Sequence, residues 1–207
     1  MTGMKKALAA ASLVVAAWAA VLTVRRHAKA QAAPEDLTMT QAAAERSEKS
    51  ERLRRIEAEL AGWPQGSRRA AQRMMLKYGP PDEATPRALT WNDNGPWKRT
   101  IVHRDAGRDV LEQIAGYHVP NDRYDVIGHL PGNVSAERGR DELSARAPDE
   151  PLNFLYLNLA DEVISGRRDA ESAVALYRQT QALTASGKTS PYTESLLFAP
   201  PQPGAQP

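Results

Sequence analysis

The segment from about Pro151 to Ser165 constrains the fold more than any other part of the chain, because it is apolar around most of a helix. Its large apolar side chains are Leu152, Phe154, Leu155, Tyr156, Leu157, Leu159, Val163 and Ile164. A helix that is hydrophobic on most sides has to be buried. We therefore expect it at the centre of a domain. Gly166 ends it, and Asp169 is placed to cap a second helix over about 170–186.

Strand patterns occupy the chain before this helix. Asn94-Gly95, within the turn 92–96, is a strong hairpin signal between two strands. The expected strands are Ala88–Trp91, Trp97–Arg104 and Val110–Val119, with two weaker ones at Val134–Arg138 and Leu143–Arg146 and a short helix at Asp122–Ile127. Strands lying between groups of helices indicate an α+β domain over residues 64–198, with an antiparallel sheet of three to five strands packed with helices. The uncharged tail, residues 199–207, is expected to be disordered.

Two helices are expected ahead of the sheet. Residues 41–63 form a polar amphipathic pattern whose narrow apolar stripe is Leu53, Ile56, Leu60 and Trp63. This segment suits either a stalk or short coiled coil, or an ordinary helix resting on the domain. A second helix follows from Ser67, a potential cap, and ends at Gly79 before two prolines.

The faces of the sheet follow from how its hairpins pair. Pairing Asn92 with Trp97, and Arg104 with Val110, divides the side chains by alternation. One face then carries Trp97, Arg99, Ile101, His103, Leu111, Gln113, Ala115, Tyr117 and Val119, and the other carries Leu89, Trp91, Lys98, Thr100, Val102, Arg104, Glu112, Ile114 and His118.

The first of these faces is the more apolar, so we assign it to the core. Trp91 beside Lys98 would then point outward, which makes this pair the candidate binding residues. The alternative is that Trp91 and Leu89 lie under another helix. A slip of one residue in either hairpin reverses the faces.

The first 30 residues have the pattern of a membrane-directing helix. An 18-residue apolar run, Ala7–Val24, is interrupted only by Ser12 and Thr23 and has basic residues on both flanks. A cleaved signal peptide and a retained anchor both fit this pattern: small residues at 28–32 suit cleavage, and the length is near the minimum for a membrane span. The flanking charges leave the orientation open, cytoplasmic exposure included. Residues 31–40 are expected to be a linker.

The charge of the chain is divided unevenly. Residues 1–30 hold 5 of the 27 basic side chains and no acid, which leaves 22 basic and 25 acidic side chains, a net charge of −3, for the remainder. That balance lacks the basic footprint of nucleic-acid binding. The absence of cysteine excludes disulfides, thiolate metal sites and lipidation of an N-terminal cysteine.

No catalytic motif for phosphate, zinc or serine chemistry occurs in the sequence. The spacing of the four histidines gives no metal site, and we expect no cofactor. An enzyme with a dispersed active site remains the alternative, and its residues would come from Arg99, His103, Asp161 or Glu162. The simpler interpretation of Asp161-Glu162 is a surface salt-bridge cluster with Arg167-Arg168.

The segment from Ser67 to about Val119 resembles the small outer-membrane assembly lipoproteins, on the helix that ends in Tyr78-Gly79-Pro80-Pro81-Asp82. The resemblance implies two helices followed by three antiparallel strands, and a non-catalytic role in the envelope. This chain departs from that family in having no cysteine to lipidate, and residues 130–187 have no counterpart there. Residues 94–100 also resemble bacterial exported proteins of unassigned function.

Together these features predict a non-catalytic binding or scaffolding protein in the cell envelope. Residues 7–24 would contact the inner membrane, and the domain would lie in the periplasm, either anchored or secreted. Its partner would be an envelope protein or a cell-wall component and not a nucleic acid. The alternative is an exported enzyme, such as a hydrolase, whose active site no motif reveals.

Overall fold

The computed structural model describes residues 34–200, and the side chains of residues 41–200. The predicted membrane-directing segment and most of the predicted tail lie outside the described residues. Within residues 34–200, no helix is long and apolar enough to cross a membrane. Contacts divide the chain into two units, Met1–Arg54 and Arg55–Pro207. The second unit contains the sheet and every helix from α3 (Gln65–Tyr78) onward.

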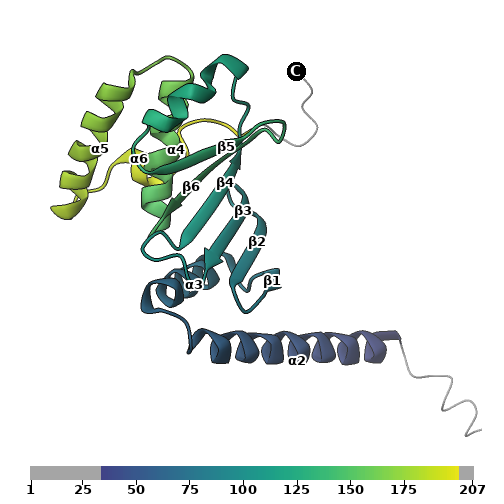
Figure 1. Ribbon diagram of the computed structural model, residues 1–207. Coiled ribbons are helices and arrows are strands. Elements are labelled where there is room, and N and C mark those ends of the chain that lie inside the picture. Colours follow the sequence, from purple (N-terminus) through teal and green to yellow (C-terminus); the bar gives the residue numbers. More distant parts are fainter. Residues whose placement is uncertain (1–33, 201–207) are drawn as a thin grey trace, which may run out of the picture. The chain divides into compact units, whose positions relative to one another are not determined.

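The second unit is an α+β domain built on one antiparallel sheet (Figure 1). The sheet has six strands in the order β1-β2-β3-β4-β6-β5, and not the three to five expected. The strands are β1 (Glu83–Ala84), β2 (Ala88–Asn94), β3 (Trp97–His103), β4 (Leu111–Gly116), β5 (Asn133–Glu137) and β6 (Glu142–Ala147). Five of them match predicted segments. The sixth, β1, has two residues, too few for any periodic pattern to appear in the sequence.

The expected outward placement of Trp91 is wrong, because the second hairpin pairs one residue away from the expected register. Val102 lies opposite Leu111, and Thr100 lies opposite Gln113. This slip places β3 residues 100 and 102 on the same face as β4 residues 111 and 113, and that face is the buried one. Trp91, opposite Thr100, is buried with them and is only 2% exposed. The alternative, in which Trp91 lies under a helix, is therefore confirmed.

A backbone irregularity brings Trp97 to the same buried side. Asp93 has a positive φ of 47° and is absent from the β2–β3 register, which pairs Asn92 with Arg99 and Asn94 with Trp97. Beyond it, Asn94 and Trp97 are both buried. The Asn94 side-chain amide donates to the Thr100 hydroxyl at 3.0 Å. Strict alternation therefore fails at this end of the hairpin, and two tryptophans enter the core.

Helix α4 (Glu150–Ile164) is the buried centre that the sequence predicts. It packs on the sheet through Phe154, Leu155 and Leu159, and Figure 1 shows it behind the strands. The helix η1 (Asn121–His129), α5 (Ala170–Ala185) and α6 (Pro191–Glu194) surround the same cluster. The predicted cap of α5 is confirmed, because the Asp169 carboxylate accepts from the Ser172 amide at 2.7 Å.

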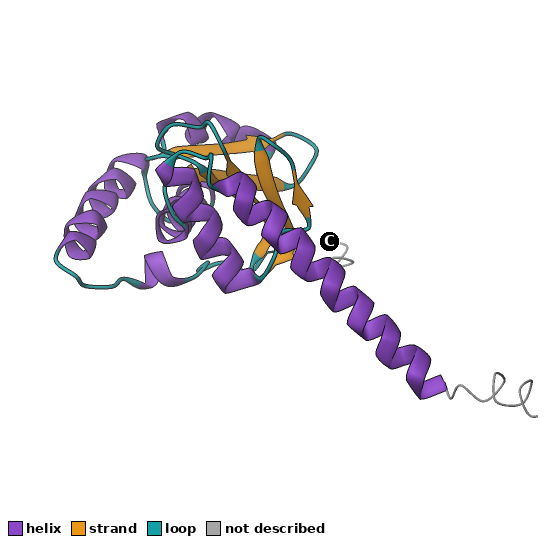
Figure 2. Cartoon of the chain, turned by 90° about the horizontal axis from the view of Figure 1, so that it is seen from below, coloured by secondary structure: helices purple, strands orange, loops and turns teal. Residues whose placement is uncertain are grey.

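Helix α2 (Pro34–Leu60) is continuous over 27 residues, so it begins within the expected linker (Figure 2). Its last two turns belong to the second unit, where Ile56 and Leu60 join a buried cluster with Trp91. For these turns, the interpretation as a helix resting on the domain is confirmed. Helix α3 completes this cluster with Ala70, Ala71 and Met74. Ser67 does not cap α3, because its hydroxyl donates to the Arg104 carbonyl at 2.6 Å.

Candidate functional site

One face of the sheet packs against the helices, and the opposite face, here called the open face, does not. Both apolar clusters use the side chains of the buried face, and every described helix of the second unit packs into one of them. In the strands β3 to β6, the side chains that alternate to the open face are Arg99, Ile101, His103, Glu112, Ile114, Asn133, Ser135, Glu137, Glu142, Ser144 and Arg146. Asn133, Ser135 and Glu137 are exposed, Ile114 is buried, and the others are half-buried.

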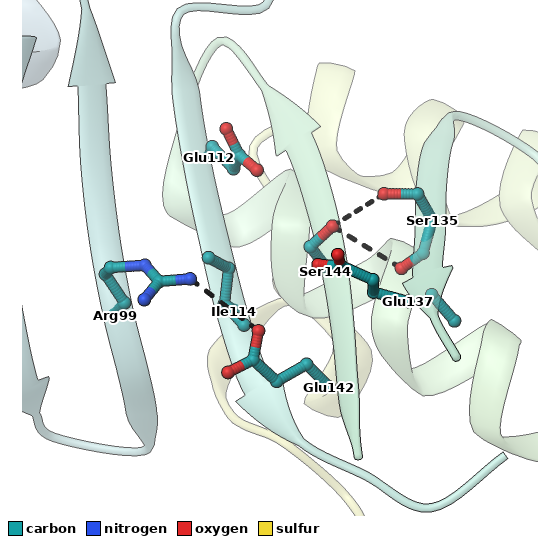
Figure 3. A pocket seen from close by; sticks show the side chains of 8 residues that line it. Arg99, Glu112, Ile114, Ser135, Glu137, Glu142 and Ser144 are labelled. Atoms are coloured by element: carbon teal, nitrogen blue, oxygen red, sulfur yellow. Dashed lines mark hydrogen bonds and ion pairs between the residues drawn. The ribbon is translucent and has the colours of Figure 1, made fainter. Parts of the chain in front are cut away.

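A pocket of about 320 Å³ lies on this open face (Figure 3). Arg99 of β3 lies on one side, Glu112 and Ile114 of β4 form its middle, and Ser144 and Glu142 of β6 lie beyond them. Ser135, Ala136 and Glu137 of β5 complete the lining. The pocket therefore spans four adjacent strands, and it offers a guanidinium, carboxylates and hydroxyls around one apolar side chain.

Glu142 joins the pocket to the end of the β2–β3 hairpin. Its carboxylate lies 2.7 Å from the Lys98 ammonium and 3.6 Å from the Arg99 guanidinium. The second distance is too long for a hydrogen bond. No other ion pair or hydrogen bond engages the Arg99 side chain among the described residues, so this guanidinium retains most of its donors for another molecule.

Glu112 is the second carboxylate of the pocket, and it lies between two basic groups. One of its oxygens is 2.7 Å from Nε2 of His103 and 3.9 Å from the Arg146 guanidinium. The hydrogen bond from His103 lowers the pKa of Glu112, and it outweighs the opposing effect of burial. Glu112 therefore remains ionised at neutral pH and holds the His103 ring in place.

Two serines form the floor of the pocket on the β5 side. Ser135 and Ser144 lie opposite each other in the β5–β6 ladder, and their hydroxyls are 2.7 Å apart. The hydroxyl of Ser144 also lies 3.4 Å from the Ser135 carbonyl. No hydrogen bond links either hydroxyl to His103 in the part of the chain that the structure describes. The serines are therefore placed to bind a polar group, and no base is in contact to activate them as nucleophiles.

The structure separates the two binding residues expected from the sequence. Trp91 is buried, and its indole donates to the Gly79 carbonyl at 2.9 Å. Lys98 is exposed and paired with Glu142 at the edge of the pocket. Of the residues expected for a dispersed active site, Arg99 and His103 reach the open face, while Asp161 and Glu162 lie on α4.

The predicted pairing of Asp161-Glu162 with Arg167-Arg168 is confirmed, but Asp161 is buried and does not lie at the surface. Arg167 pairs with Asp161, and Arg168 pairs with Glu162 at 2.6 Å. Burial and the Asp161 carboxylate raise the pKa of the Tyr117 hydroxyl, which donates to that carboxylate at 3.0 Å. Each group has a structural partner, so this cluster ties α4 to the neighbouring segments.

Four residues that line the pocket were not predicted from the sequence, namely Ser135, Glu137, Glu142 and Ser144. Small apolar and polar residues alternate in 133–137 and 142–147, and this alternation predicted two weak strands but not the place of these side chains in a site. Pairing those strands beside β4 would have placed these side chains next to Glu112. Nothing local in the sequence indicates that pairing, because β6 and β4 are 25 residues apart in the chain.

A second polar cluster is buried between α3, α4 and the sheet. Glu150, the first residue of α4, is 6% exposed. Its carboxylate accepts hydrogen bonds from Lys77 at 2.5 Å, Tyr78 at 2.5 Å, Trp97 at 2.7 Å and Gln113 at 3.1 Å. These donors come from α3, β3 and β4, so the carboxylate joins three elements to α4. With its acceptor sites filled by the protein, this cluster is a structural one.

No group of three potential metal ligands occurs among residues 34–200. The open face is therefore the candidate site, and its chemistry is that of polar recognition. No family model, curated protein or solved structure matches this chain.

Proposed function

We propose that this chain is a non-catalytic binding or scaffolding protein of the bacterial cell envelope, and that the open face of its sheet receives the partner. The observation that carries this proposal is the pocket around Arg99, which lies on the face of the sheet opposite the packed helices of the second unit. A guanidinium with free donors beside carboxylates and hydroxyls favours a partner with both hydrogen-bond donors and acceptors. A polypeptide segment and a cell-wall component both have this character.

The envelope location rests on the sequence of the first 30 residues. Their apolar run with basic flanks is typical of segments that enter the export pathway or remain in the membrane. The resemblance of Ser67–Val119 to outer-membrane assembly lipoproteins supports the same compartment. The net charge of −3 after residue 30 is also better suited to a protein or cell-wall partner than to a nucleic acid.

Catalysis is the second candidate, and the His103–Glu112 contact favours it. A carboxylate that orients a histidine is a common part of a general base. The pocket supplies no nucleophile in contact with His103, and the other expected catalytic residues, Asp161 and Glu162, are engaged by arginines elsewhere. Binding therefore explains more of the arrangement than catalysis does.

The location is tested by the intact mass of the native protein in separated membrane, periplasmic and cytosolic fractions. We expect either the full-length mass in the membrane fraction or a chain shortened by about 30 residues in the periplasm. The first result identifies an anchor and the second a cleaved signal. A full-length chain confined to the cytosolic fraction would contradict the envelope location.

The binding face is tested by photo-crosslinking in intact cells. A photoreactive amino acid at Ile101, on the open face, is expected to give a discrete adduct, because this side chain lies on the sheet surface beside Arg99 and His103. The same amino acid at the exposed Ala175 of α5 is the matched control and is expected to give none.

The adduct at Ile101 should disappear when Arg99→Ala is added, because the guanidinium is the donor with free capacity in the pocket. Replacing Arg178, an exposed arginine of α5, by alanine removes the same charge elsewhere and should leave the adduct intact. An adduct that survives Arg99→Ala, or one found equally at Ala175, would assign the partner to another surface.

A further inference from the structure

Helix α3 has an exposed face that is basic and has a leucine at its centre. At 100° per residue, positions 68, 72, 76, 69, 73 and 77 follow one another around half of the helix. They are Arg68, Gln72, Leu76, Arg69, Arg73 and Lys77. Leu76 lies near the middle of this arc and is 90% exposed, the most exposed large apolar side chain of the described residues. The opposite half of the helix, Ser67, Ala70, Ala71 and Met74, is buried.

The arginines of this face have no carboxylate partner among the described residues. Arg68 donates to the Ala61 carbonyl at 3.4 Å, and Arg73 donates to the Pro148 carbonyl at 3.0 Å. The Arg69 side chain makes no hydrogen bond or ion pair with residues 41–200, whose side chains the structure describes. Of the four basic residues, only Lys77 has an acidic partner, Glu150. Helix α3 itself contains no acid, so three positive charges surround Leu76.

We propose that this face of α3 is a docking surface for an anionic phospholipid bilayer, with Leu76 entering the headgroup region and the three arginines on the lipid phosphates. Charge complementarity carries the proposal, together with the exposure of a leucine at the centre of the charges. Arginine binds phosphate oxygens through two parallel hydrogen bonds, and its aliphatic stem can remain in contact with apolar surroundings. The inference rests on the envelope location proposed above.

An acidic protein is the competing partner for such a surface. It would use the arginines equally well, but it would gain little from a leucine that stands alone with no apolar neighbours to form the core of an interface. A bilayer needs no matching pocket, because a single apolar side chain can enter the acyl boundary while basic side chains hold the headgroups. The composition of this face therefore favours the lipid surface.

The chain contains no cysteine, so Leu76→Cys gives a single site for an environment-sensitive fluorophore. The full-length labelled protein is reconstituted with vesicles of phosphatidylcholine, or of equal parts phosphatidylcholine and phosphatidylglycerol. We expect emission at shorter wavelength in the anionic vesicles than in the neutral ones. The shift should vanish in about 1 M salt, where the Debye length falls to about 3 Å. The same label at Glu171, exposed on α5, is expected to show no shift.

A variant with fewer charges on α3 tests whether this surface, and not another part of the chain, contacts the bilayer. Adding Arg69→Gln and Arg73→Gln should lower the ratio of membrane-contacting to free label about 25-fold, because each basic residue at an anionic surface contributes about fivefold. Removing two exposed charges of the α5 region instead, by Arg178→Gln and Lys188→Gln, should leave the shift unchanged.

Flotation with the neutral vesicles separately reports whether the N-terminal segment enters membranes, and thus tests the location. An unshifted label in the anionic vesicles overturns the α3 proposal whether or not the protein floats. A shift that persists in the Arg69→Gln, Arg73→Gln variant overturns it as well. In either case an acidic protein would replace the bilayer as the expected partner of this face.

Discussion

Replacing Glu150 by glutamine is expected to lower the free energy of unfolding by about 3 kcal/mol at neutral pH. The carboxylate accepts from four donors, and two of them, the indole of Trp97 and the amide of Gln113, are buried. A glutamine can keep one acceptor oxygen for these two. Tyr78 donates to the same oxygen as these two, whereas Lys77 donates to the other oxygen, so the amide nitrogen of glutamine would face the Lys77 ammonium at 2.5 Å.

The loss of stability caused by Glu150→Gln should become smaller as the pH falls. Burial raises the pKa of the Glu150 carboxyl, but the hydrogen bonds from Lys77, Tyr78 and Trp97 together outweigh it, and the pKa lies below its usual value. A carboxyl with a lowered pKa in the folded state stabilises the fold above its unfolded pKa. That stabilisation is lost as the pH falls through the folded pKa. The carboxyl of an unfolded chain titrates near about pH 4.3, so the loss occurs below this value.

Urea unfolding at about pH 7 and about pH 3 measures both effects. The difference between the wild type and Glu150→Gln should shrink at the lower pH, because a protonated glutamate, like glutamine, is uncharged and has a donor in place of one acceptor. Glu171→Gln makes the same chemical change at an exposed position of α5 and should alter stability by less than about 0.5 kcal/mol. A Glu150→Gln protein as stable as the wild type at neutral pH would contradict the structural role assigned to this carboxylate.

The sequence predicts the elements of this fold better than it predicts their faces. The apolar stretch around Leu155 and Leu159 identified α4, and Asp169 marked the start of α5, because both signals are local. The helix start at Pro34 was missed. The α2 residues before Gln41 carry few of the apolar repeats on which such predictions depend.

The open face was assigned to the wrong side of β3 by a shift of one residue. The turn after His103 was expected to pair Arg104 with Val110, whereas the ladder ends at Val102 opposite Leu111. Because side chains alternate, this shift moves Arg99 from the expected core to the surface and Thr100 in the opposite direction. Because the candidate binding residues were inferred from the sheet faces, Trp91 was placed on the wrong side of the sheet by the same shift. Lys98 remained exposed because it lies at the hairpin end.

Replacing Trp91 by alanine is expected to lower the free energy of unfolding by about 3–5 kcal/mol. The indole fills the cluster between β2, α3 and the last turns of α2, where Ile56, Leu60 and Met74 surround it. Its removal leaves a cavity and also leaves the Gly79 carbonyl without the indole donor. Thermal or urea unfolding of the purified protein measures the loss.

Two further substitutions distinguish a packing role of Trp91 from a role in binding the partner. Trp91→Phe keeps most of the apolar volume and loses the hydrogen bond, so we expect a smaller loss of about 1–2 kcal/mol. Leu76→Ala removes a side chain that is 90% exposed and should change stability by less than about 0.5 kcal/mol. Stability that is unchanged in Trp91→Ala, with loss of the Ile101 crosslink, would mean that Trp91 contacts the partner. In that case the face predicted from the sequence would be the binding face, and the role of the pocket around Arg99 would have to be reassigned.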